Sequence, residues 1–176
     1  MPYELNIDYK NYNISSVKRL NYNSVFSTTA HPIANEKKDH LYLYGYNNYD
    51  FNNGNFIFNV FDKKMNLLNQ KNISLINNGM IHDVGYINNY MIIPDMPLKY
   101  DINRIFKEKL PIYFDKEKGE TRFGVFNIKK ETVKWYNFKD NFFIFHFAKV
   151  RKTSHKFIIY ACVMEELFVE DFIDVN

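Results

Sequence analysis

Short runs of β-branched and aromatic residues, several of them alternating with polar residues, follow one another along most of the chain. Such runs are typical of β-strands, and the Asn-, Asp- and Gly-containing segments between them are typical of turns. The clearest runs are 40–46, 56–61, 121–128, 132–138 and 156–164. The pattern therefore predicts an all-β fold.

Two regions differ from these runs. Residues 3–24 are polar and predict a weak hairpin, in which Val17–Tyr22 is the better strand. Asp101 precedes apolar residues at helical spacing, which predicts a short helix or helical turn over 101–107.

Residues 78–98 contain the first candidate functional residue, His82. Their pattern predicts two short strands around an Asn88-Asn89 turn, with Pro94 and Pro97 ending the second strand. His82 is placed on the first of these strands, with glycines on both sides that allow another backbone or a bound group to come close. A metal ligand and a core histidine bonded to a backbone carbonyl both fit this stretch.

Two further histidines also close strand-like runs. His31 ends the run that begins at Val25, and His146 follows the apolar run that begins at Phe142. The three histidines are 51 and 64 residues apart, a little more than the roughly 40–50 residues of one four-stranded propeller blade. One histidine on the innermost strand of each blade would bring all three to a central axis, where a metal ion could bind.

Three segments resemble the metal-ligand segments of the carotenoid cleavage oxygenase family. The first is Thr29–Leu43, with Thr-Ala-His-Pro followed by a charged turn and a strand. The second joins Met80–Asp83 to Pro94–Leu98, and it is the most specific. The third begins at Arg122-Phe123-Gly124-Val125 and ends at His146.

The resemblance implies a fold and a site. The fold is part, about three blades, of a seven-bladed β-propeller, and residues 1–176 are one incomplete domain that lacks the N-terminal and C-terminal blades. The site is a ferrous iron, Fe(2+), held by four histidines without a carboxylate. His31, His82 and His146 match three of them, and a second chain could supply the fourth with the missing blades.

The implied activity is oxidative cleavage of a conjugated carbon–carbon double bond of a carotenoid or related polyene by dioxygen. The alternative is a catalytically inactive propeller fragment, a relic or an interaction module. After His146 the family usually shows Asn, a small residue, an aromatic and an acid, whereas this chain has the basic run Phe147–Lys152. Asp83 is expected on the face opposite His82, as a structural residue rather than a ligand. A phosphohydrolase His-Asp pair would lie on a helix, but His82 is predicted on a strand.

Composition and charge limit the expected binding partners and cellular location of the chain. The net charge of +3 is small and Lys is scattered, so no nucleic-acid partner is expected. Cys162 is the single cysteine and is predicted to be a buried thiol without a disulfide partner. The chain carries no run of membrane-span length and no signal peptide at its first residues, so a cytoplasmic location is expected. Family members contact membranes through an apolar patch, and the sequence pattern indicates none here.

Overall fold

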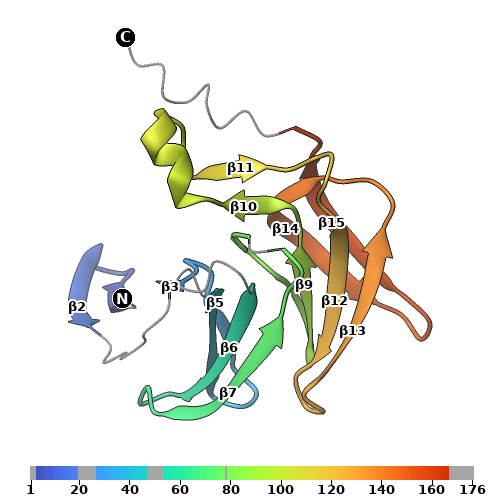
Figure 1. Cartoon of the computed structure of the whole chain (residues 1–176). Coiled ribbons are helices and arrows are strands. Elements are labelled where there is room, and N and C mark those ends of the chain that lie inside the picture. Colours follow the sequence, from blue (N-terminus) through green and yellow to red (C-terminus); the bar gives the residue numbers. More distant parts are fainter. Residues whose placement is uncertain (1–2, 20–26, 47–53, 78, 167–176) are drawn as a thin grey trace.

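The computed structural model describes residues 3–19, 27–46, 54–77 and 79–166, and almost all regular structure in them is β-strand. Its first sheet, called the first blade, has the order β3-β5-β6-β7, with β4 also paired to β5 (Figure 1). β6 is buried at six consecutive positions because apolar clusters cover both faces of this sheet. The strands are β3 (Ser27–Thr28), β4 (Ile33–Asn35), β5 (His40–Tyr46), β6 (Asn55–Asp62) and β7 (Leu67–Ser74).

The second sheet, called the second blade, has the antiparallel order β13-β12-β9-β8. Asn88 takes the left-handed conformation, with φ 56°, in the tight turn between β8 and β9. β9 is buried along five of its six residues, and its Met91 and Ile93 side chains pack into the larger apolar cluster. The strands are β8 (Gly85–Ile87), β9 (Tyr90–Asp95), β12 (Thr121–Asn127) and β13 (Thr132–Phe138).

The third sheet pairs β14 (Phe143–Lys152) with β15 (Phe157–Met164), and β14 lies against β8 of the second blade. The pairing of β14 with β15 is irregular between Ile144 and Lys149. Two hairpins complete the described structure: β1 (Tyr3–Asp8) with β2 (Asn13–Arg19), and β10 (Leu98–Tyr100) with β11 (Ile112–Phe114). The 3₁₀ helix η1 (Ile102–Lys107) connects β10 to β11 (Figure 1).

Two apolar clusters hold the three sheets together. The larger lies between the two blades and combines aromatic side chains of β5 and β6 with Ile81, Val84 and residues of β9 and β12. The smaller lies between β14 and the end of the second blade, around Met96, Leu98 and Phe143. The segment 79–84 connects the first blade to the second, so residues next to His82 belong to the larger core.

Most predicted elements are confirmed. β5 spans the predicted residues, the hairpin of β12 and β13 is present, and η1 lies where the short helix was predicted. The Asp101 side chain caps η1 by accepting a hydrogen bond from the Asn103 N–H at 2.9 Å. The predicted strand Val17–Tyr22 is described only to Arg19, and its remaining residues lie outside the described part. The all-β fold is confirmed, with two blades and two strands of a third.

Three predictions need correction. His82 lies in an irregular segment just before β8 rather than on a strand. Pro94 does not end β9 but lies within it, where the pairing with β8 has already stopped at Ile92. Cys162 is exposed, because one face of β15 is uncovered by any described residue.

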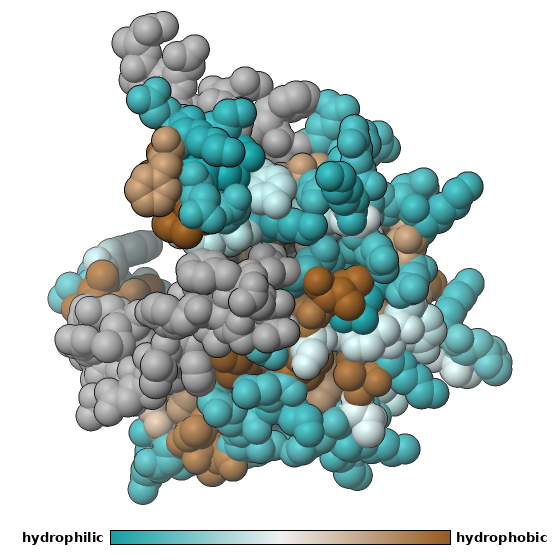
Figure 2. Space-filling model, viewed as in Figure 1, coloured by the Kyte–Doolittle hydropathy of each residue, from teal (hydrophilic) through white to brown (hydrophobic). Residues whose placement is uncertain are grey.

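Some apolar side chains outside the core are exposed. η1 exposes apolar side chains, and Figure 2 shows hydrophobic surface over this element. The exposed fractions are 39% for Ile102, 49% for Ile105 and 85% for Phe106. Among the described residues, no helix has the length and apolar character to cross a membrane.

Candidate metal centre

The three predicted histidines converge, one from each sheet. Their candidate ligand nitrogens all lie within 4.8 Å of one another, and no other His, Cys, Asp or Glu of the described segments joins the group. The Nε2 atoms of His31 and His82 are 3.2 Å apart. The ring centroids are 4.9–5.1 Å apart in all three pairs. Residues 51 and 64 positions apart in the chain thus form one cluster.

His31 lies between β3 and β4, at the inner edge of the first blade. Its position is set by short-range bonds: the Thr29 N–H donates to the Tyr44 carbonyl of β5 at 2.9 Å. The His31 N–H donates to the Thr29 hydroxyl at 3.5 Å. The strand β4 then pairs with β5 from Ile33 onward, so His31 is the corner between two strands held by the same partner.

His82 is held by the residues around it. Ile81 and Val84 are buried in the core between the blades, at 3% and 5% exposure, which directs the intervening His82 ring toward the other histidines. Gly85 begins β8 and lets this strand approach β14 closely. A Cβ at Gly85 would lie 2.6 Å from a methyl carbon of Val150. The predicted close approach beside a glycine is therefore present, and it is made by protein atoms.

His146 lies where β14 departs from regular pairing. The register with β15 shifts between Ile144 and Phe147, so Phe145 and His146 have no paired residue on β15. Such a bulge re-aims side chains relative to a regular strand. His146 is exposed, whereas His31 and His82 are half-buried, so the cluster is open on the His146 side.

The donor set fits a divalent transition metal. Imidazole nitrogen binds such ions at about 2.0–2.1 Å, so two adjacent ligands at a right angle would lie about 3 Å apart. The 3.2 Å separation between the Nε2 atoms of His31 and His82 is close to that value. Imidazole suits iron, copper, nickel and zinc, and the cluster contains no carboxylate that would favour magnesium or calcium.

The electrostatics favour neutral imidazole at the centre of the cluster. Burial, followed by the neighbouring His31 and His146 rings, lowers the pKa of His82 below its ordinary value of 6.5, and the Asp83 charge opposes this shift only in part. A neutral ring offers a lone pair to a metal ion, whereas a protonated ring cannot. His82 can therefore offer a neutral ring nitrogen to a metal ion near neutral pH.

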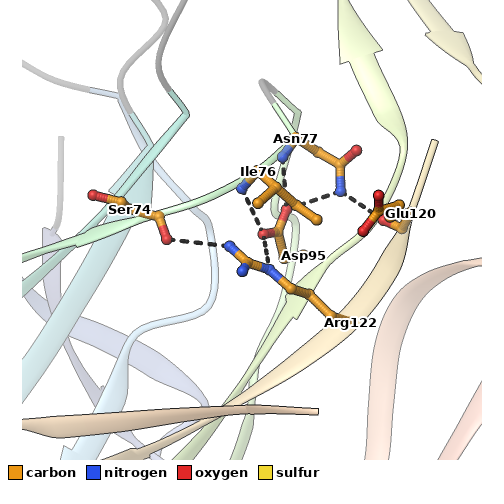
Figure 3. A network of polar contacts seen from close by, with 6 residues as sticks. All are labelled: Ser74, Ile76, Asn77, Asp95, Glu120 and Arg122. Atoms are coloured by element: carbon orange, nitrogen blue, oxygen red, sulfur yellow. Dashed lines mark hydrogen bonds and ion pairs between the residues drawn. The ribbon is translucent and has the colours of Figure 1, made fainter. Parts of the chain in front are cut away.

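A buried polar network anchors the segment that leads to His82 (Figure 3). Asp95, at the end of β9, accepts hydrogen bonds from the N–H groups of Ile76 and Asn77 at 2.8 and 3.1 Å. It also accepts from the Arg122 Nε at 2.8 Å, and Arg122 donates to the Ser74 carbonyl at 3.4 Å. This network was missed from the sequence, where the only signal was one acid closing the apolar run of β9.

Successive antiparallel sheets of five, four and two strands, with a histidine cluster where they meet, define part of a β-propeller with a candidate metal centre. The whole chain, residues 1–176, matches the model of the family described as Retinal pigment epithelial membrane protein. The chain therefore belongs to this family, the carotenoid cleavage oxygenases.

Known relatives agree with this assignment. The chain is 27% identical over 153 residues to carotenoid 9,10(9',10')-cleavage dioxygenase 1 of Pisum sativum, covering 84% of this chain and 26% of the relative. It is 28% identical over 143 residues to the protein of the same name from Arabidopsis thaliana, covering 79% of this chain and 26% of the relative. The chain thus spans about a quarter of the length of these relatives.

Solved structures share the fold. A lignostilbene dioxygenase of Pseudomonas brassicacearum superposes with a TM-score of 0.69 at 17% identity, covering 81% of this chain and 30% of that one. A cobalt-substituted Synechocystis ACO also gives 0.69, at 15% identity, covering 93% of this chain and 36% of that one. The predicted propeller fold is confirmed by these likenesses.

Proposed function

We propose that this chain is part of an iron(II) oxygenase that cleaves a conjugated carbon–carbon double bond of a carotenoid, apocarotenoid or stilbene-type compound. His31, His82 and His146 are the proposed metal ligands. The observation that carries the proposal is the convergence of three imidazoles from three sheets, within 4.8 Å, in a chain of this family. The activities named for the plant relatives and for the Pseudomonas neighbour support polyene or stilbene cleavage.

The chain's residues would contribute binding and orientation. Ferrous iron, when bound, would supply the dioxygen chemistry of the cleavage. Three neutral imidazoles leave the ion its full charge of +2 and leave coordination positions open. The open side of the cluster, next to exposed His146, is where further ligands and substrate would approach. A divalent ion of this kind is also supported by the cobalt named for the Synechocystis structure.

We propose that further polypeptide completes the propeller, either as more of the same chain or as a second chain. Among the strands that the structure describes, β15 pairs only with β14, so its other edge can accept another strand. Apolar side chains next to this edge are exposed, among them Tyr160 at 46% and Val163 at 52%. A strand added here would continue the third sheet as a blade, and added blades would bring the fourth histidine.

We also propose that η1 contacts a lipid surface. Polyene substrates are lipophilic and partition into membranes. Phe106, exposed at 85%, projects from η1 with Ile105 beside it. Arg104 and Lys107 lie in the last turn of the same helix, a combination of apolar and basic side chains that suits a membrane interface.

The alternative is a propeller fragment without catalysis that acts as an interaction module. The exposed edge of β15 favours this alternative, because an open edge is a pairing site whether or not a metal binds. Metal binding separates the two functions, since an interaction module has no need of three converging imidazoles.

The test is an anaerobic titration of the 176-residue chain with Co2+, followed by the visible absorption of the bound ion. One ion is expected to bind per chain, and His82→Ala is expected to weaken its binding at least about tenfold. His155→Ala is the matched control, because His155 is exposed in the turn between β14 and β15 and should leave affinity unchanged. Equal uptake by the wild type and His82→Ala would overturn the proposed site.

The catalytic part needs a second measurement. The Fe2+-loaded chain is mixed with a stilbene and an apocarotenoid, with and without a polypeptide that carries the remaining blades. Cleavage is expected only in the presence of that polypeptide. Absence of cleavage by a reconstituted, Fe2+-loaded assembly would favour the interaction module.

A further inference from the structure

Asp83 stands directly beside a candidate ligand, yet its carboxylate faces the protein. One oxygen, Oδ1, accepts hydrogen bonds from the Val84 N–H at 2.7 Å and from the Tyr44 hydroxyl at 3.2 Å. The other, Oδ2, accepts from the Phe147 N–H at 2.9 Å. Both oxygens are thus occupied by protein donors, and Asp83 is not a member of the histidine cluster.

Two of the three donors lie on segments that carry a histidine, and the third lies on the strand that pairs with the His31 segment. Val84 is on the His82 segment, and Phe147 directly follows His146 on β14. Tyr44 is on β5, and its carbonyl accepts from the N–H of Thr29, two residues before His31. A single carboxylate therefore connects the first blade, the segment before β8 and the third sheet at the level of the cluster.

The bond to Tyr44 remains a donor–acceptor pair over the whole physiological range. Tyr44 is 1% exposed, and burial raises the pKa of its hydroxyl, with the Asp83 charge adding to the shift. The phenol therefore stays protonated and donates. Hydrogen bonds to a charged acceptor are about twice as strong as neutral ones, which suits a tie between separate sheets.

We propose that Asp83 is a positioning residue that fixes the mutual spacing of His31, His82 and His146 through its bonds to Tyr44 and Phe147. It acts on the backbone and on a neighbouring strand, because its carboxylate oxygens accept from Val84, Tyr44 and Phe147 rather than from an imidazole nitrogen. This differs from a carboxylate that holds the second ring nitrogen of a ligand. The inference rests on the proposed metal function and deepens it.

The spacing is measured first without metal. Ring protons of the three histidines, with centroids 4.9–5.1 Å apart, should give nuclear Overhauser effects to one another in the 176-residue chain. Asp83→Asn places an N–H₂ group against a backbone or hydroxyl donor, so these effects should be lost. Asp62→Asn is the matched control, because Asp62 accepts two backbone N–H bonds in an exposed turn between β6 and β7. Unchanged effects in Asp83→Asn would overturn the inference.

A second variant distinguishes the loss of one specific hydrogen bond from unfolding of the whole chain. Tyr44→Phe removes only the tie to β5, so the effects between His31 and the other two rings should weaken while those between His82 and His146 persist. Equal weakening in all three pairs, or none in any, would contradict a positioning role for Asp83.

Metal affinity is the second readout. Loss of residues that orient ligands typically weakens metal binding about 10- to 100-fold, and Asp83→Asn should weaken Co2+ binding to this extent while Asp62→Asn does not. A wild-type chain that shows the ring contacts but binds no Co2+ would refute the proposed function and leave the positioning role supported. Asp83→Asn with wild-type Co2+ affinity would refute the positioning role alone.

Discussion

Replacing Asp95 by Asn should destabilise the fold more than any loss of a surface charge. The Asp95 side chain is 1% exposed and that of Arg122 is 14% exposed, so the pair is largely removed from water. Asn has the same shape and can still accept one or two of the present bonds. It leaves the Arg122 guanidinium without a counter-charge, however, and presents an N–H₂ group to a donor.

The expected cost follows from the burial of this pair. Removing one partner of a buried ion pair costs about 3–5 kcal/mol, and the retained carbonyl argues for the lower end, about 3 kcal/mol. For a domain of this size 1 kcal/mol corresponds to about 2–4 °C, so the midpoint of thermal unfolding should fall by about 6–12 °C. Asp39→Asn is the control, since the Asp39–Lys63 pair has side chains 69% and 71% exposed and should change stability by less than about 0.5 kcal/mol.

Urea unfolding followed by circular dichroism gives the free energy, and tryptophan fluorescence reports on the site. Trp135 is the single tryptophan, and the Arg122 guanidinium carbon lies 3.9 Å from its ring centroid. A displaced Arg122 should therefore alter Trp135 emission in Asp95→Asn. A free energy of unfolding within about 0.5 kcal/mol of the wild type, with unchanged emission, would refute the assignment of this network as a stabilising anchor.

Four further outcomes are expected. Gly85→Ala should lower the free energy of urea unfolding by about 1–3 kcal/mol and weaken Co2+ binding, because the new methyl group would overlap Val150 of β14. An unchanged free energy of unfolding would contradict this packing of β8 against β14. The pKa of His82 is lowered in the folded state, so the unfolded chain binds more protons and the free energy of unfolding should fall as the pH drops below 6.5, levelling off below the pKa of the folded state. A midpoint of unfolding that stays flat or rises as the pH is lowered below 6.5 would contradict the lowered pKa. Cys162 is exposed, so a thiol reagent should label it in the native chain as fast as in urea, and a strongly protected thiol would contradict the structure of β15. Phe106→Glu should reduce co-sedimentation with phosphatidylcholine–phosphatidylserine vesicles, whereas the control Tyr12→Glu, at a site 95% exposed on another hairpin, should not. Equal binding of the two variants to the vesicles would exclude η1 as the element that contacts lipid.

The sequence predicted the convergence of the three histidines better than the local structure around them. His31, His82 and His146 could be found because each follows a recognisable strand-like run and because the motifs around them resemble one family. The irregular segment at His82 and the bulge at His146 could not be found, since both depend on pairing between strands far apart in the chain. Strand propensity alone extends a strand through such positions.

Long-range polar contacts between strands were also not predicted from the sequence. The carboxylate of Asp83 does lie away from the histidine cluster as expected, but the reason given by strand alternation does not hold, because His82 and Asp83 lie outside any strand. Nothing local shows that the partners of Asp83 are Tyr44 and Phe147. The pairing of Asp95 with Arg122 has the same cause, because the two residues meet only when β9 and β12 align. Cys162 was predicted to be buried because β15 is apolar, and the strand instead exposes one face.

The origin of the three imidazoles from three separate sheets also sets an order of events. Each blade pairs strands that are close in sequence and can form early, whereas the cluster exists only after the sheets have docked. Metal capture would therefore be a late step, and its binding free energy would add to the docking of the sheets rather than to any one of them. A loaded chain would lose its three sheets in a single cooperative transition, while the empty chain could release β14 and β15 first.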